Sequence, residues 1–273
     1  MTRSVIEIPG FESLSHGSQT VLIRPEWKPW LLDDLLGGFG RIDPSRRRFY
    51  SHGRVAHFSY LPGGAPGRVF VRQATRGGLI GVLLGGLYAG VDRPLRELRA
   101  ATAARTAGVS VPEPLAVLVR RIGGVFCRFT VVAREVENAQ DLLTVASTPS
   151  TARKRELVDR VADEMRRLHE SGVYHGDLTM KNILVGGTSV YIIDLDKATL
   201  APRRDERMDM MNLSRLNRSV VKLLGTRGFV SRTDKLRFLR RYLGGRDRIK
   251  ELSQVCAQGL WFHRLWWSMT GQA

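Results

Sequence analysis

Cysteine is scarce in this sequence, since its 273 residues include only Cys127 and Cys256. Two cysteines are too few for a disulfide framework or a zinc site, and we expect a protein of the reducing cytoplasm. No run of about 18 apolar residues is present, which predicts that no segment spans a membrane. The first residues, MTRSVIEIPGFESLSHG, lack the basic start and apolar core of a secretory signal.

Acidic residues are also few. The chain has 26 Asp and Glu against 43 Lys and Arg, a formal net charge of +17. Such an excess predicts an anionic partner: nucleic acid, a phosphorylated small molecule or an acidic membrane surface. A proteome that is rich in arginine throughout would also explain it. The basic residues are spread along the chain and accompany no recognised DNA- or RNA-binding motif, so we expect no nucleic-acid partner.

The chain divides into two halves with different patterns. At 43% hydrophobic residues, it is long enough for one large domain or two small lobes. Residues 1–136 are mainly strand-like with one expected helix, and about residues 1–45 are interpreted as an N-terminal extension. Residues 137–273 are mostly helical. We therefore expect an α+β protein with two lobes.

The first half contains four recognisable strands and a helix. RVAHFSYL and RVFVRQ are β-rich runs separated by PGGAPG, a pattern typical of a hairpin. Asp92 and Pro94 begin a helix that ends at Gly108. PLAVLVRR and VFCRFTVVAREV are two further strands.

The second half opens with a long helix predicted over Arg153–Glu170, which ends before Gly172. One face of this helix is apolar, formed by Leu157, Val158, Val161, Met165 and Leu168. Further along, NILV and SVYIID flank a Gly186-Gly187 turn and predict a second hairpin.

Between that helix and that hairpin lies VYHGDLTMKNILV, which contains His175, Asp177 and Asn182, followed on the hairpin by Asp194. H-x-D-x₄-N with a downstream aspartate is the pattern of a protein-kinase-like catalytic loop. The alternative is a polar turn with capping side chains, but the spacing and the flanking elements favour a site. Phosphoryl transfer needs positioning and charge neutralisation more than covalent chemistry.

Each polar residue of the loop then has an expected role. Asp177 would orient the acceptor hydroxyl and take its proton. Asn182 and Asp194 would offer oxygen ligands to Mg²⁺, which prefers hard oxygen donors. His175 is expected to pack under the loop and hydrogen-bond its backbone.

The nucleotide-binding residues should lie upstream. Arg72, on the strand VFVRQ, stands where a kinase usually has the lysine that grips the α- and β-phosphates. Glu97 is the candidate acidic partner of this arginine on the following helix. Gly53, in FYSHGRVAHF, is the candidate glycine of a phosphate-covering loop. The alternatives are an exposed strand residue for Arg72 and an ordinary helix-surface charge for Glu97.

Several stretches together resemble the bacterial lipopolysaccharide inner-core kinases, that is, the 3-deoxy-D-manno-octulosonic acid (Kdo) kinases and their heptose kinase relatives. The stretches are VRQATRGGLIG, LYAG, GVSVPEPLAV, YHGDLTMKNILV, YIIDLDKA and NLSRLNRSVVKL, in the family's order over about residues 50–225. The resemblance implies arginine at position 72. Met208 departs from it, since an aromatic residue is expected there.

The resemblance implies a protein-kinase-like fold, with a β-rich nucleotide-binding lobe over residues 1–136 and a helical catalytic lobe over residues 137–273. It implies ATP and Mg²⁺ as cofactors and phosphorylation of a sugar hydroxyl, with Kdo expected, in the lipid A–inner core of lipopolysaccharide. The enzyme would act peripherally at the anionic cytoplasmic face of the bacterial inner membrane.

Other functions stay open at this point. A heptose kinase, or a kinase for another small molecule or a protein side chain, would share the loop. Because no A-P-E segment follows Asp194, a small or lipid-linked acceptor is favoured over a peptide. A non-catalytic nucleotide-binding module is the alternative from another class.

The end of the chain, GLWFHRLWWSMT, carries a cluster of aromatic residues, namely Trp261, Phe262, Trp266 and Trp267. Indole rings favour the headgroup region of a membrane. Completion of the helical core is the alternative, and the helical spacing favours it.

Overall fold

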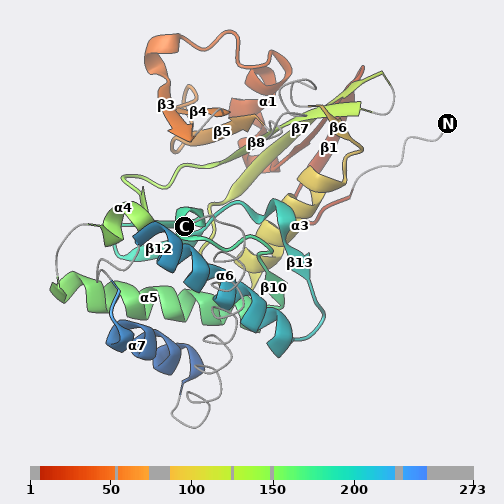
Figure 1. Ribbon diagram of the computed structural model, residues 1–273. Coiled ribbons are helices and arrows are strands. Elements are labelled where there is room, and N and C mark those ends of the chain that lie inside the picture. Colours follow the sequence, from red (N-terminus) through yellow and green to blue (C-terminus); the bar gives the residue numbers. More distant parts are fainter. Residues whose placement is uncertain are drawn as a thin grey trace, which may run out of the picture. The chain divides into compact units, whose positions relative to one another are not determined.

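The computed structural model of the chain describes residues 7–52, 55–73, 87–123, 126–147, 151–224 and 230–244. The chain forms two compact units, which we call the N-terminal unit (Met1–Thr102 and Pro112–Val136) and the C-terminal unit (Ala103–Val111 and Glu137–Ala273). Strands dominate the first unit and helices the second (Figure 1).

An antiparallel sheet forms the N-terminal unit. Its strands are β1 (Glu12–His16), β2 (Gln19–Ile23), β3 (Arg48–His52), β4 (Val55–Tyr60), β5 (Val69–Gln73), β6 (Tyr88–Ala89), β7 (Pro114–Ile122) and β8 (Phe126–Arg134). They are ordered β1-β2-β7-β8-β5-β4-β3, with β6 pairing with β8. The predicted hairpin is confirmed, since β4 pairs with β5 in the register His57↔Arg72. Strands β1 and β2, which fall in the segment interpreted as an extension, are part of the sheet.

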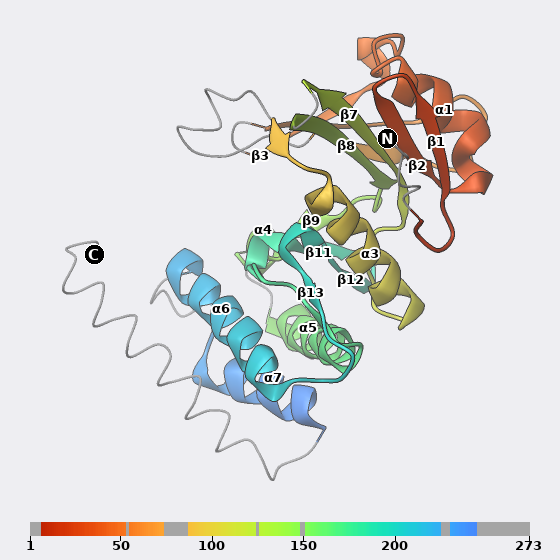
Figure 2. The ribbon, with the colours of Figure 1, turned by 90° about the vertical axis from the view of Figure 1, so that its right-hand side faces the viewer.

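Apolar side chains fill both faces of this sheet because successive strand residues point to opposite sides. On β2, Val21 and Ile23 belong to one buried cluster, which also contains Leu31 and Leu35 of α1 (Lys28–Leu36). Leu22 belongs to a second cluster, which includes apolar residues of α3 (Asp92–Thr106). Helix α1 lies beside β2 (Figure 2). This unit therefore contains α1 in addition to the one helix that the sequence analysis expected.

The C-terminal unit is built mainly of helices. Its elements are β9 (Gln140–Asp141), α4 (Leu142–Ala146), α5 (Thr151–Glu170), β10 (Val173–Tyr174), β11 (Ile183–Gly186), β12 (Ser189–Ile192), β13 (Thr199–Leu200), α6 (Glu206–Leu224) and α7 (Arg232–Leu243). Helices α5 and α7 pack side by side in both views (Figures 1 and 2). The predicted long helix and second hairpin are confirmed as α5 and β11–β12. None of the helices in the described ranges is both long and apolar enough to cross a bilayer.

A buried polar network joins three of these helices. The Nδ1 atom of His169 on α5 lies 2.8 Å from the hydroxyl of Tyr242 on α7. Arg204 donates hydrogen bonds to the same hydroxyl (3.0 Å) and to the carboxylate of Asp209 on α6 (2.7 Å). Burial lowers the pKa of His169 to about 4, so the imidazole is neutral at neutral pH. Buried polar groups are tolerated when they are paired, and these contacts join α5, α6 and α7 to one another.

Candidate active site

The loop with the kinase-like pattern leaves β10 and turns sharply at Gly176, whose φ is +72°. A Cβ atom at this position would lie 2.3 Å from the backbone oxygen of Lys197. Only glycine meets both conditions, because it tolerates a positive φ and adds no side chain. The glycine between His175 and Asp177 therefore lets the loop lie directly against the segment that contains Lys197.

Buried apolar side chains and backbone hydrogen bonds anchor the loop. The side chains of Leu178 and Met180 are fully buried. The backbone N–H of Met180 donates a hydrogen bond to Ser219 Oγ on α6 (3.1 Å), and the N–H of Asn182 donates to the Thr179 oxygen (3.0 Å). Alternating buried and polar residues in LTMKN thus anchor the loop and leave its polar side chains available on the other side.

His175 supports the loop, as predicted. Its side chain is completely buried, with Nε2 2.8 Å from the Ile193 carbonyl oxygen and Nδ1 3.3 Å from the backbone N–H of Asp177. These partners require the proton on Nε2, since a carbonyl can only accept and an N–H can only donate. Burial lowers the pKa of His175, which keeps this neutral tautomer. The imidazole connects the loop to the end of the β11–β12 hairpin.

Asp194 follows that hairpin in a left-handed conformation, with φ 64° and ψ 57°. A non-glycine residue in this region costs about 1–2 kcal/mol, and such strain concentrates at functional sites. The N–H of Ile193 donates to the backbone oxygen of Asn182 (3.0 Å), which brings Asn182 beside the residue that precedes Asp194. The two expected metal ligands therefore come together through the hairpin backbone.

The amide of Asn182 has a defined orientation. Its Nδ2 donates to the Asp177 backbone oxygen (2.9 Å), and its Oδ1 accepts no hydrogen bond from the residues that the structure describes. No group of three or more His, Cys, Asp or Glu within the described ranges could hold a metal ion by itself. A carboxylate and an amide oxygen fit Mg²⁺, which keeps several waters and usually takes substrate phosphates as further ligands.

Two cations flank the carboxylate of Asp177. Lys197 Nζ lies 2.6 Å from Oδ2, and Arg215 Nη1 lies 3.3 Å from Oδ1. Arg215 Nη1 also donates to the backbone oxygen of Gly176. Burial alone would raise the pKa of Asp177, but the hydrogen bond and charge of Lys197 and the charge of Arg215 outweigh it, so this pKa lies below its ordinary value. Asp177 is therefore ionised at neutral pH.

Sequence reasoning gave no role to Lys197 or Arg215. Both lie in stretches that carried the family resemblance, YIIDLDKA and NLSRLNRSVVKL, and this was the available signal. Their approach to Asp177 depends on how the chain folds, since 20 and 38 residues separate them from it.

The N-terminal unit brings together the two charged residues predicted for nucleotide binding. Arg72 on β5 forms an ion pair with Glu97 on α3, with 22% and 12% of their side chains exposed. The pair links the sheet to the helix, so neither residue is an isolated surface charge. Gly53, the third predicted nucleotide-binding residue, lies outside the described residues.

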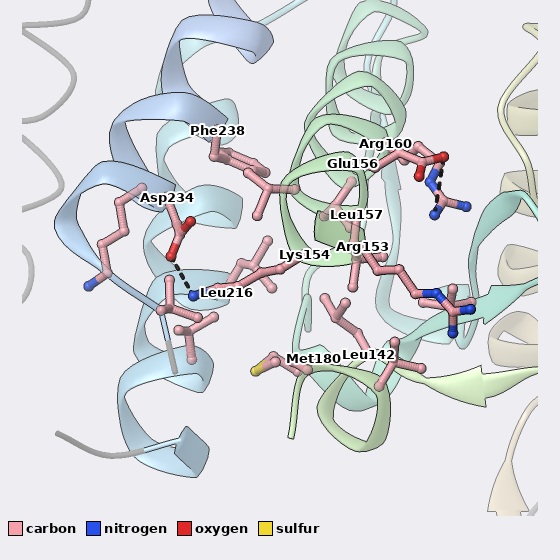
Figure 3. A pocket seen from close by; sticks show the side chains of 18 of the residues that line it. Leu142, Arg153, Lys154, Glu156, Leu157, Arg160, Met180, Leu216, Asp234 and Phe238 are labelled. Carbon is pink, nitrogen blue, oxygen red and sulfur yellow. Dashed lines mark ion pairs between the residues drawn. The ribbon is translucent and has the colours of Figure 1, made fainter. Parts of the chain in front are cut away.

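A separate apolar cavity of about 1090 Å³ lies among the helices of the C-terminal unit (Figure 3). Leu142, Leu157, Leu216 and Phe238 line it from α4, α5, α6 and α7. Near it, Lys154 pairs with Asp234 (2.6 Å). Met180 of the loop also lines the cavity, whereas Asp177, Asn182 and Asp194 are not among the described lining residues.

An antiparallel sheet with an Arg–Glu pair and a helical unit with the H-x-D-x₄-N loop together define a protein-kinase-like α+β fold. The solved structure of "WaaP in complex with acyl carrier protein" shares this fold with a TM-score of 0.60 and 21% identity, over 89% of this chain and 96% of that chain. Residues 70–242 match the lipopolysaccharide kinase (Kdo/WaaP) family. The chain belongs to that family.

Several relatives carry the name 3-deoxy-D-manno-octulosonic acid kinase, two Vibrio proteins among them. The protein of Vibrio vulnificus (strain CMCP6) is 34% identical over 157 residues, which are 56% of this chain and 64% of the relative. That of Vibrio cholerae serotype O1 is 32% identical over 163 residues, 58% of this chain and 67% of the relative. This chain thus spans 64% of the length of the first of these relatives.

Replacement of Lys197 by glutamine tests the electrostatics of the loop. Because the ammonium group stabilises ionised Asp177, Lys197→Gln should raise the pKa of Asp177, as measured by carboxyl NMR titration. Lys181→Gln is the matched control, since Lys181 is an exposed cation of the same loop and makes no ion pair in the described structure. The same Asp177 pKa in both variants would contradict the assigned ion pair.

Proposed function

We propose that the protein is an ATP-dependent kinase that phosphorylates a sugar hydroxyl, expected to be on Kdo, in the lipid A–inner core of lipopolysaccharide. The observation that carries this proposal is the geometry of the loop: Asn182 donates to the backbone oxygen of ionised Asp177, and its own backbone oxygen accepts from Ile193, the residue before Asp194. Family membership and the names of the relatives support the choice of acceptor. A heptose kinase of the same pathway is the second candidate. A kinase for another small molecule or for a protein side chain is a further alternative.

Each residue has one proposed task. Asp177 accepts a hydrogen bond from the acceptor hydroxyl, orients its oxygen toward the phosphoryl group and receives its proton. Asn182 and Asp194 would hold Mg²⁺ through their side-chain oxygens, and the ion when bound would neutralise phosphate charge. Arg72, oriented by Glu97, would bind the α- and β-phosphates through its planar fork.

The direct test is incubation of the purified protein with ATP, magnesium and defined lipid A–core acceptors, some ending in Kdo and some in heptose. Mass spectrometry of the products would locate the new phosphate. A phosphate on Kdo supports the first candidate, and one on heptose supports the second. No phosphate on either acceptor would refute an inner-core kinase.

Loss of the Asp177 carboxylate should affect transfer more than binding. Asp177→Asn keeps the shape of the side chain but removes the proton acceptor, so the transfer rate should fall by about 10²–10⁴-fold with ATP affinity retained. Asp159→Asn is the control, because Asp159 is a carboxylate of α5 that is paired with Arg237. Turnover of Asp177→Asn close to that of the wild type would show that another residue positions the acceptor.

Two variants test the residues proposed for nucleotide binding. Asp194→Ala removes the one charged ligand proposed for the metal, so magnesium-dependent ATP binding should be lost in calorimetry. Arg72→Ala should weaken ATP binding more than it lowers the melting temperature. Unchanged ATP affinity in both variants would place the nucleotide site elsewhere.

Membrane association is a further part of the proposal, because a lipid-linked acceptor requires the enzyme to reach an anionic surface. The net charge of +17 supports this, since each Lys or Arg near such a surface contributes about 1 kcal/mol. We propose peripheral binding at the cytoplasmic face of the inner membrane. The C-terminal aromatic residues that could add to it, Trp266 and Trp267 among them, lie outside the described residues.

Liposome flotation tests this association. Anionic vesicles should retain the protein at low salt and release it at high salt, while neutral vesicles serve as the control. The double replacement Trp266→Ala and Trp267→Ala should weaken retention without lowering the melting temperature. A large drop in melting temperature with unchanged flotation would instead assign these tryptophans to the protein core.

A further inference from the structure

Helix α6 places two arginines beside the catalytic loop. Arg215 and Arg218 are three residues apart and therefore lie on the same face of the helix. Arg215 contacts the loop through Nη1 alone, which donates to the Gly176 oxygen and approaches Asp177 Oδ1. Its Nε and Nη2 atoms have no hydrogen-bond partner among the described residues, so one edge of the guanidinium is available.

The available Nε–Nη2 edge of Arg215 is suited to binding an anion. Nε–H and Nη2–H point in the same direction and form the fork that binds a carboxylate or phosphate with two parallel hydrogen bonds. Because Nη1 is held by the loop, the fork of Arg215 is fixed relative to Asp177. An anion bound there would lie next to the residue proposed to contact the acceptor hydroxyl.

Arg218 adds a second cation that the described protein does not neutralise. It is half-buried and forms no ion pair or hydrogen bond within the described ranges. Burial lowers the pKa of Arg218, and the positive charge of Arg215 also lowers it, because the two guanidinium groups repel each other. Lys197 and Arg215 contact the single carboxylate of Asp177, and Arg218 adds a third positive charge on the same face of α6 as Arg215. Such an excess is stabilised by an anionic ligand.

We propose that Arg215 and Arg218 form a subsite that binds the carboxylate of an acidic acceptor sugar and so determines acceptor specificity. This inference rests on the proposed function, in which Asp177 contacts the acceptor hydroxyl. An octulosonic acid carries hydroxyls and a carboxylate on one small molecule, so its hydroxyl can reach Asp177 while its carboxylate reaches the fork of Arg215. A neutral sugar would leave Arg218 and the Nε–Nη2 edge of Arg215 without an anion.

The experiment compares two acceptors that differ only in this charge, namely a Kdo-terminated lipid A acceptor and the same molecule with the Kdo carboxylate converted to a carboxamide. Wild-type protein should show a KM about 10–100-fold lower for the carboxylate, the usual scale for a hydrogen-bonded charge. Arg218→Gln, and Arg215→Lys, which keeps a charge and a donor to Gly176 but lacks the fork, should lose most of this preference. In both variants the KM for the carboxylate acceptor should therefore approach the KM for the carboxamide acceptor.

Lys222→Gln is the matched control, because it removes an exposed cation of the same helix and should keep the preference. Melting temperatures establish that each variant is folded. Equal KM values of wild-type protein for the two acceptors, or equal losses by the variants on both, would overturn the carboxylate subsite while leaving the kinase assignment intact. Absence of transfer to either acceptor by wild-type protein would instead refute the proposed function, and this inference with it.

Discussion

The hydrogen bond between buried His175 and the Ile193 carbonyl oxygen is the contact on which the candidate site depends. It ties the loop that carries Asp177 to the hairpin that leads to Asp194, although the two segments are separated along the chain. Nδ1 of this imidazole also accepts from the Asp177 N–H, which only the neutral form can do, and burial keeps it neutral by lowering its pKa. Loss of this partner would leave a buried carbonyl unsatisfied, which costs about 1–3 kcal/mol. The geometry of the carboxylates thus follows from a histidine that needs no part in the chemistry.

The cations around Asp177 bear on the role that we propose for this residue. A carboxylate with a lowered pKa is a weak base, so strong proton abstraction does not suit it. A loose phosphoryl-transfer transition state makes little demand for such a base, because the acceptor oxygen loses its proton late and gains mainly from correct orientation. Lys197 and Arg215 hold the carboxylate in one position from two sides. The low pKa and the fixed geometry therefore suit the role that we propose for Asp177, which orients the acceptor hydroxyl and receives its proton late, as the bond to phosphorus forms.

Local pattern was sufficient to predict the β4–β5 and β11–β12 hairpins, α5 and the supporting role of His175, since each depends on neighbouring residues. Helix α1 was not predicted, although Leu31 and Leu35 are spaced as on a helix face, because their burial depends on the sheet they cover. The Arg72–Glu97 pair was predicted from order along the chain. The approach of Arg215 to Asp177 was not predicted, because it requires the packing of α6 against the loop.

Positive charge acts over long and short distances in this protein, and salt screens the long-range attraction more strongly than the short-range one. Attraction of the whole chain, at +17, to an anionic surface is screened over about 8–10 Å at moderate ionic strength. A half-buried guanidinium in direct contact with a carboxylate is screened much less, since little electrolyte enters between them. An overall basic composition can therefore account for approach to a membrane but not for discrimination between two sugars. Discrimination requires a cation that is fixed close to the reacting group, and Arg215 meets this condition, because its Nη1 is held by the Gly176 oxygen and lies 3.3 Å from Asp177 Oδ1.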